Sequence, residues 1–185
     1  MVLDVLVKIA RELNSKNIKW VVGSSIVMNH FNLVDKMNDV DIIVSREDIH
    51  KADEVLKQMG VMRPLEIDPG IYTTEVFHEY VVDGIDVDMM CGFGISHEEG
   101  IYEYELNNDS YVDSFNLDGE KIYYSSLEDW YVLYQLIGGR EVKVNKIEDY
   151  LMNEDCNVSK LSNILKKSLP ISIANRVEQL LIKKK

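Results

Sequence analysis

Long apolar runs are absent from this sequence of 185 residues. No stretch approaches the roughly 20 apolar residues that a helix needs to cross a bilayer. The charged residues Asp4, Lys8 and Arg11 interrupt the segment where a signal peptide would carry its apolar core. Cysteine is also scarce, because Cys91 and Cys156 stand 65 positions apart and form neither a C-x-x-C pair nor a disulfide framework. We therefore expect a cytoplasmic protein with two reduced thiols, without a membrane-spanning segment or a zinc knuckle.

Basic residues are few in the middle of the chain. The segment from Asp39 to Asp129 holds 23 acidic and 5 basic residues, whereas the rest holds 9 acidic and 15 basic residues, for a net charge of −12. Extended nucleic acids bind mainly through Lys and Arg contacts to phosphates, so a duplex lying across this segment would be repelled. We expect no extended nucleic-acid partner, and a polyanionic ligand in this segment would need bound cations. Most of these carboxylates have the ordinary role of keeping the protein solvated.

The remaining composition is that of a globular protein. Hydrophobic residues make up 46% and charged residues 28% of the chain, and the length accommodates one full domain with a small helical appendage. Apolar residues recur at helical spacing in some segments and alternate in others. Helices are predicted for residues 2–14, from the Gly23 turn to His30, and from a Ser45 cap to residue 59. Single strands are predicted for residues 18–22 and 40–44. Pairs of strands that form hairpins are predicted around Asp83-Gly84 and Asp118-Gly119.

The periodicity changes near residue 125. After Ser126 the pattern is helical, with further helical segments near residues 143–153, 157–167 and 170–183. We predict an α+β fold in which a mixed β-sheet flanked by helices occupies residues 1–124. A small C-terminal helical region follows in residues 125–185.

Four aspartates fall in pairs on two of the predicted strands. Side chains alternate across a strand, so Asp39 shares one face with Asp41, and Asp86 likewise shares a face with Asp88. Two like charges this close repel unless a proton or a cation lies between them, and Mg²⁺ takes oxygen ligands from one or two carboxylates together with phosphates. If the two strands are neighbours, three acids can converge on one divalent-metal site. For a D-x-D pair taken alone, a solvated strand edge is the alternative.

The turn Gly23-Ser24 is the complementary half of such a site. A glycine turn at the start of a helix presents backbone N–H groups and a hydroxyl to an anion, which suits a triphosphate. Lys36, just before Asp39, is a further candidate for contact with a phosphate, and an exposed loop lysine is its alternative interpretation. The prediction depends on the order of the elements: a buried strand, the Gly-Ser turn, a helix, the strand with the D-x-D pair, a hairpin, and a strand with another acid.

This order resembles the nucleotidyltransferase superfamily that includes DNA polymerase β. The similarity is greatest to its minimal bacterial and archaeal branch, which takes in antibiotic adenylyltransferases and the nucleotidyltransferase toxins of abortive-infection systems, and it covers residues 18–93. Within it, the segment from Val87 to Phe93 resembles the end of the strand that bears the third acid. The resemblance therefore implies Asp88 as the third carboxylate, with Asp86 as the alternative.

The resemblance implies a metal-dependent enzyme that moves a nucleoside monophosphate from an NTP such as ATP to an acceptor hydroxyl and releases pyrophosphate. The implied catalytic residues and ligands of Mg²⁺ or Mn²⁺ are Asp39, Asp41 and Asp88, and the implied phosphate-binding residues are Gly23, Ser24 and Lys36. The third carboxylate would join a second metal or accept the proton of the attacking hydroxyl. The charge distribution favours a compact acceptor, and the oligomeric state stays open.

A second interpretation is a catalytically silent module of the same fold that binds a nucleotide or a partner protein. The predicted helix after Glu128-Asp129 has Tyr134 where many relatives carry a lysine, which favours this interpretation. A third interpretation, a purely structural acidic domain, requires the ordered motif to be a coincidence.

Overall fold

The computed structural model describes residues 1–64, 70–106 and 113–184. The chain divides into two compact units, one built from residues 1–68, 74–93 and 105–125 and the other from residues 69–73, 94–104 and 126–185. The first unit contains the main sheet, and the second contains the C-terminal helices with a two-stranded sheet. The division at residue 124 into a nucleotidyltransferase-like core and a helical region stays a prediction.

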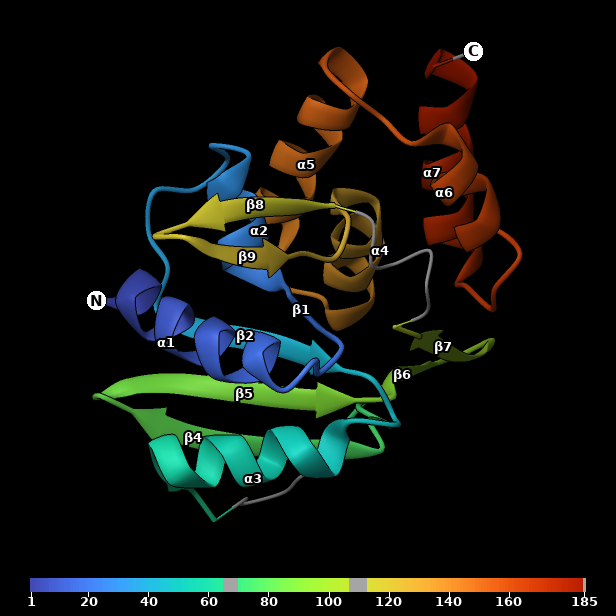
Figure 1. Ribbon diagram of the computed structural model, residues 1–185. Coiled ribbons are helices and arrows are strands. Elements are labelled where there is room, and N and C mark those ends of the chain that lie inside the picture. Colours follow the sequence, from blue (N-terminus) through green and yellow to red (C-terminus); the bar gives the residue numbers. More distant parts are fainter. Residues whose placement is uncertain (65–69, 107–112, 185) are drawn as a thin grey trace. The chain divides into compact units, whose positions relative to one another are not determined.

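The described part of the first unit combines helices with a five-stranded sheet and a separate hairpin (Figure 1). Its helices are α1 (Val2–Ser15), α2 (Ser24–His30) and α3 (Ile49–Met59). The strands of the sheet are β1 (Trp20–Val22), β2 (Asp39–Val44), β3 (Val61–Met62), β4 (Val76–Val82) and β5 (Ile85–Cys91). The hairpin consists of β8 (Ser114–Leu117) and β9 (Glu120–Tyr123).

The five-stranded sheet has the order β1-β2-β5-β4-β3. Strands β2 and β5 are parallel, and the other neighbours are antiparallel. The turn between β4 and β5 is formed by Asp83 and Gly84, both at positive φ, as a two-residue hairpin turn requires. Both hairpins expected from Asp-Gly pairs are therefore present, and the mixed sheet confirms the predicted α+β class.

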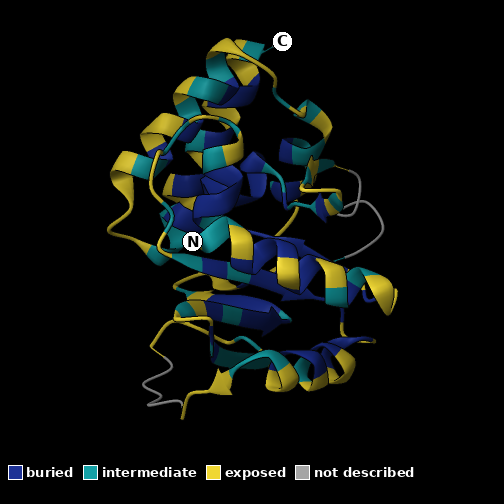
Figure 2. Ribbon diagram, turned by 60° about the vertical axis from the view of Figure 1, so that its left-hand side comes forward, coloured by how far each residue is buried: buried dark blue, intermediate teal, exposed yellow. Residues whose placement is uncertain are grey.

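Helices α1 and α3 cover one face of this sheet. Their apolar stripes are buried, among them Leu6 and Ile9 on α1 and Leu56 on α3, and both helices lie along the strands in Figure 1. Figure 2 shows the same division, with buried residues on the strands and exposed residues on the outer sides of the helices. On this face Tyr80 of β4 donates a hydrogen bond to Asp53 of α3, which fastens the helix to the sheet. Neither α1 nor α3 covers the opposite face of the sheet.

Helix α3 begins later than predicted. It starts at Ile49 with Asp48 as its N-terminal cap residue, and Ser45 does not cap it. The Ser45 hydroxyl instead donates to the Asp48 carboxylate, which also accepts the backbone N–H of Lys19. The predicted cap was wrong because residues 46–48 form a turn, closed by the Asp48 N–H and the Ser45 carbonyl oxygen, and the helix begins only after it.

The second unit contains the predicted C-terminal helices. They are α4 (Leu127–Ile137), α5 (Glu141–Asn153), α6 (Val158–Ile164) and α7 (Ile171–Lys184). A two-stranded sheet of β6 (Phe93–His97) and β7 (Gly100–Tyr104), which the sequence patterns did not indicate, belongs with them. Among the residues that the structure describes, no helix has the length and apolarity to cross a membrane.

Candidate active site

The four aspartates that the sequence suggests as site residues lie side by side on β2 and β5. The parallel register of these strands pairs Asp39 with Asp86 and Asp41 with Asp88. Strand neighbours lie about 4.8 Å apart and paired side chains point to the same face, so all four carboxylates lie on one face of the sheet. This is the face opposite α1 and α3, because Val40 and Val87, which alternate with the acids, are fully buried in the core. The pairing that would bring three acids together is therefore present.

A further carboxylate on this face was missed from the sequence. Strand β4 pairs antiparallel with β5, and its Glu79 is the partner of Asp88. Asp41, Asp88 and Glu79 thus form a line across three adjacent strands, which we call the acid row. The face that carries the acid row together with Asp39 and Asp86 is called the acidic face. The signal was in the sequence, because counting four residues outward from each side of the Asp83-Gly84 turn pairs Glu79 with Asp88.

The position of Asp88 at the centre of the acid row changes its acidity. Burial, followed by the charges of Asp41, Glu79, Asp39 and Asp86, raises the pKa of Asp88 from its ordinary value of 3.8 to about 7. Both causes disfavour the ionised form in the absence of a counterion. A carboxylate in this position therefore favours a bound proton or a nearby cation.

The Gly23-Ser24 turn lies next to the acid row. The backbone N–H of Gly23 donates to the carbonyl oxygen of Asp41 at 3.0 Å, so the turn extends β1 alongside the D-x-D pair. Ser24, the first residue of α2, has a φ of 54°, a left-handed conformation that is uncommon for a residue with a Cβ and that is often found at functional sites. The Ser25 hydroxyl is buried and has no hydrogen-bond partner among the described residues. The turn thus has an uncommon backbone conformation next to the acids, and the helix residue that follows it has a buried hydroxyl without a partner among the described residues.

The other two sequence candidates lie at the edge of this group. Lys36 is exposed in the loop that leads from α2 to Asp39. Asp86 has a partner, because the Arg63 guanidinium contacts its carboxylate at 2.8 Å. Asp88 has no such basic partner among the described residues. The structure therefore separates the two candidates for the third carboxylate: Asp86 is ion-paired, whereas Asp88 lies between other acids.

The donor set of the acidic face fits a hard divalent cation. Among residues 1–64, 70–106 and 113–184, no three carboxylate, imidazole or thiolate groups gather tightly enough to form a complete protein-only metal site. Mg²⁺ does not require such a cage, since it is commonly held by one or two carboxylates together with water and substrate phosphates. Asp41 and Asp88, in register on neighbouring strands, offer that arrangement of oxygen ligands.

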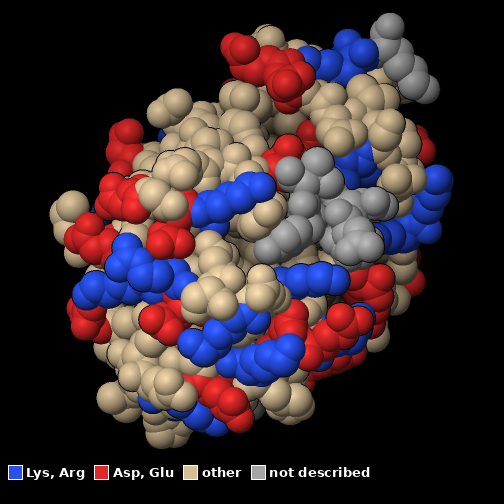
Figure 3. All heavy atoms as spheres, in the orientation of Figure 1, with Lys and Arg blue, Asp and Glu red and all other residues tan. Residues whose placement is uncertain are grey.

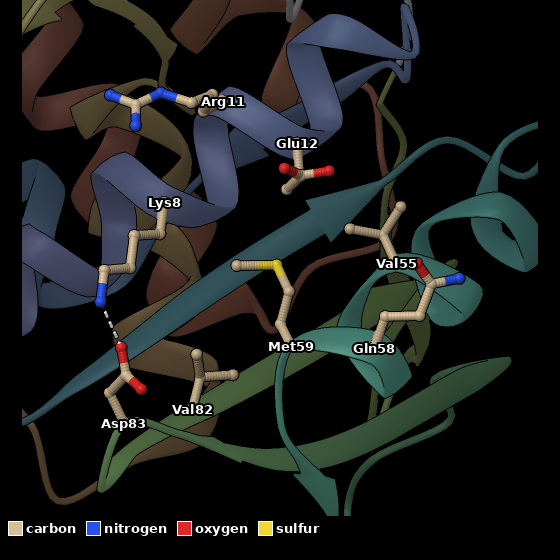
Figure 4. Close-up of a pocket in the computed structure, with 8 residues that line it drawn as sticks. All are labelled: Lys8, Arg11, Glu12, Val55, Gln58, Met59, Val82 and Asp83. Carbon is tan, nitrogen blue, oxygen red and sulfur yellow. Dashed lines mark hydrogen bonds and ion pairs between the residues drawn. The ribbon is translucent and has the colours of Figure 1, made fainter.

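A cavity of about 420 Å³ lies away from these acids (Figure 4). It is lined by α1, α3 and the β4–β5 turn, including Met59, Val82 and the ion pair of Lys8 with Asp83 at 2.5 Å. Val82 belongs to the same strand face as Tyr80, which contacts α3, so this cavity lies on the side opposite the acidic face. None of the predicted site residues lines it, so this cavity does not mark the candidate site.

In the second unit, the residues at the start of α4 and Tyr134 within it have packing roles. Ser126 caps α4 by accepting the backbone N–H of Asp129, and Asp129 forms an ion pair with Lys160 at 2.9 Å. Tyr134, at the position where the resemblance implies a lysine, is buried. The ammonium group of Lys143 donates to its hydroxyl at 3.3 Å. A lysine is therefore present at this position of the helical unit, but it comes from α5.

Solved structures of similar shape identify the fold. A candidate nucleotidyltransferase from Thermotoga maritima (TM1012) matches with a TM-score of 0.62 and 25% sequence identity, over 80% of this chain and 91% of that chain. The chain has the nucleotidyltransferase fold. No protein-family profile matches it, and no curated protein sequence matches it significantly. The predicted resemblance to the nucleotidyltransferase superfamily is therefore confirmed by structure, where sequence comparison finds nothing.

Two antibiotic-modifying nucleotidyltransferases also share this fold. ANT(2'')-Ia, solved in complex with adenylyl-2''-tobramycin, matches with a TM-score of 0.57 and 12% identity, over 88% of this chain and 93% of that chain. The lincosamide antibiotic adenylyltransferase LnuA, solved with lincomycin bound, matches with a TM-score of 0.54 and 11% identity, over 77% of this chain and 94% of that chain. The nucleotidyltransferase fold thus spans most of this chain and of each neighbour.

Proposed function

We propose that this nucleotidyltransferase-fold protein transfers a nucleoside monophosphate from an NTP to an acceptor hydroxyl and releases pyrophosphate. The observation that carries the proposal is the placement of Gly23 beside Asp41 and of Asp41 beside Asp88, in one line across the sheet. This line combines an anion-binding turn with a pair of carboxylates that suits a cation. A triphosphate with its bound cation requires both features at adjacent positions.

Each residue of the line has a defined task in this proposal. Gly23 and Ser24 bind the triphosphate through the turn, with Lys36 as a further phosphate contact, while Asp39 and Asp41 hold a Mg²⁺ or Mn²⁺ ion. A bound metal would neutralise phosphate charge and polarise the reacting phosphoryl group. Asp88 serves as the third metal ligand or takes the proton of the acceptor hydroxyl. Such transfer depends on positioning and charge neutralisation, so a covalent nucleophile is not required.

The acceptor in this proposal is a compact molecule. LnuA is described as a lincosamide antibiotic adenylyltransferase and was solved with lincomycin bound, and ANT(2'')-Ia was solved with adenylyl-2''-tobramycin. ATP is accordingly the first donor to test. The acidic face also disfavours a long polyanionic acceptor, because its carboxylates would repel successive phosphates.

The substitution Asp41→Asn tests the proposal. We expect ATP with Mg²⁺ or Mn²⁺ to raise the melting temperature of the wild-type protein, and pyrophosphate to be released in the presence of an acceptor mixture. Asp41→Asn should lose the metal-dependent shift and slow pyrophosphate release by about 100-fold or more, equivalent to about 2.7 kcal/mol. All four common NTPs are compared by thermal shift and by a coupled pyrophosphate assay.

A matched control is Asp149→Asn, which makes the same change at an exposed position of α5 and should behave as wild type. Nucleotide binding without pyrophosphate release would favour the catalytically silent module, for which Tyr134 in place of a lysine is the supporting observation. The proposal is wrong if no NTP shifts the melting temperature with either metal and Asp41→Asn leaves the metal response unchanged.

A further inference from the structure

The positively charged guanidinium of Arg63 lies against the acidic face. Its backbone N–H donates to the carbonyl oxygen of Glu79 at 2.8 Å, which continues the pairing of β3 with β4. Its guanidinium reaches the carboxylate of Asp86 on β5 at 2.8 Å. Asp86 pairs in register with Asp39. The charged end of Arg63 is therefore held one strand away from a proposed metal ligand.

A triphosphate on this face requires more positive charge than one metal ion supplies. The acidic face carries Asp39, Asp41, Glu79, Asp86 and Asp88. A nucleoside triphosphate adds about four negative charges near neutral pH, and one divalent cation offsets only part of this total. A basic side chain within reach of the phosphates would stabilise the complex, and Arg63 is already positioned against the face.

The guanidinium of Arg63 also has hydrogen-bonding capacity to spare. Its closest contact with Asp86 joins a terminal nitrogen to a carboxylate oxygen, and a guanidinium has five N–H donors in all. The side chain of Arg63 is 48% exposed and that of Asp86 is 51% exposed, so a ligand can reach the pair. A guanidinium binds phosphate oxygens in a bidentate manner that a lysine cannot reproduce.

We propose that Arg63 binds the phosphate end of the nucleotide and that Asp86 is the residue that positions it. This inference rests on the proposed function and assigns the two acids of β5 to different tasks: Asp88 serves the metal and the reacting groups, and Asp86 holds the arginine. It also explains why a strand with one catalytic acid carries a second acid two residues before it on the same face.

Binding of phosphate ligands to Arg63 variants tests this assignment. The probes are α,β-methylene-ATP with Mg²⁺, which resists transfer, and inorganic pyrophosphate with Mg²⁺, both followed by calorimetry. Arg63→Gln should weaken both probes about 10-fold, and Arg63→Lys should recover only part of the loss, because a lysine restores charge without the bidentate geometry. Asp86→Ala should weaken nucleotide binding less than Arg63→Gln does and should keep the Mn²⁺-dependent thermal shift, which Asp88→Asn should lose.

The control is Arg11→Gln. Arg11 forms an ion pair with Glu120 at 3.1 Å and lines the cavity on the opposite side of the sheet, so its loss changes the net charge equally without touching the acidic face. The inference is overturned if Arg63→Gln, folded as judged by its melting curve, binds both probes within twofold of wild type or no more weakly than Arg11→Gln. It is also overturned if Asp86→Ala removes the Mn²⁺ response, which would make Asp86 a metal ligand. Failure of the wild-type protein to bind any nucleotide would instead refute the proposed function.

Discussion

The carboxyl group of Asp88 keeps its proton to a higher pH in the folded chain than in the unfolded chain. In the folded protein, burial and the neighbouring carboxylates raise its pKa to about 7, whereas the ordinary value is 3.8. The folded state therefore holds a proton that the unfolded state releases between about pH 4 and pH 7. Over this window the contribution of Asp88 to stability falls as the pH rises, and it is constant above about pH 7. The sign is the reverse of that for a carboxylate in an ion pair.

The pH dependence of unfolding should reveal this effect. We expect Asp88→Asn to match wild type near pH 4 and to be more stable by about 1 to 2 kcal/mol near pH 8 in the absence of metal, because the amide avoids the charge repulsion. Urea unfolding in a chelating buffer across this range measures it, and the difference between the two proteins cancels the titration of groups that do not interact with Asp88. A stability difference that did not change with pH would contradict the prediction.

Individual elements could be predicted where residues close together in the sequence determine them. The Asp83-Gly84 turn sets the register of β4 against β5, because a two-residue turn leaves no freedom in the pairing of the strands. The same register places Glu79 beside Asp88, so this pair within the acid row was implicit in the hairpin. The alternation of Asp39 and Asp41 with buried residues likewise indicated which side chains share a face.

Non-local features could not be predicted from the same patterns. Nothing in the β2 segment indicates that β5 is its parallel neighbour, and this pairing brings Asp41 and Asp88 together. The ion pair of Arg63 with Asp86 joins residues from separate strands, and it was missed for the same reason. Strands β6 and β7 were missed because their pairing joins short segments without a strong turn signal.

Gly60 determines how closely β3 can approach β4. It follows α3, and a Cβ at this position would overlap the carbonyl oxygen of Val81 and lie 2.8 Å from Cγ2 of Val82. Val81 is the pairing partner of Val61, the first residue of β3. A side chain at Gly60 would therefore push β3 away from β4 and move Arg63, which follows β3.

Gly60→Ala tests this connection between an element and the candidate site. We expect a loss of about 2 kcal/mol or more in the free energy of unfolding, because the clash involves backbone that cannot rotate away. Nucleotide binding should also weaken, as it should in Arg63→Gln, because Arg63 is displaced. Urea unfolding and calorimetry measure the two effects, and Gln58→Ala, on the preceding turn of α3, is the control. Wild-type stability in Gly60→Ala would show that β3 tolerates displacement.

The distribution of charge over the whole chain bears on its ligands. The chain carries a net charge of −12, and the view in Figure 3 shows Lys and Arg side chains gathered over the region of α1 and α3 among Asp and Glu. Several of these cations are already in ion pairs, such as Lys8 with Asp83 and Arg11 with Glu120. The acidic face lies on the other side of the sheet. We therefore expect the acidic face to bind a compact ligand that brings its own metal ion more readily than a long polyanion.

Nucleic-acid binding distinguishes these two kinds of ligand. A labelled single-stranded RNA of about 20 nucleotides should show no saturable binding near 0.1 M salt, because its phosphates would extend past the metal ion over uncompensated carboxylates. Mg²⁺ with ATP should raise the melting temperature under the same conditions, since a single triphosphate meets the Gly23 turn, the metal ligands and Arg63 together. Fluorescence anisotropy and thermal shift provide the comparison. RNA binding that weakens steeply with salt would contradict the prediction and would make a nucleic-acid end, rather than a compact molecule, the acceptor to pursue.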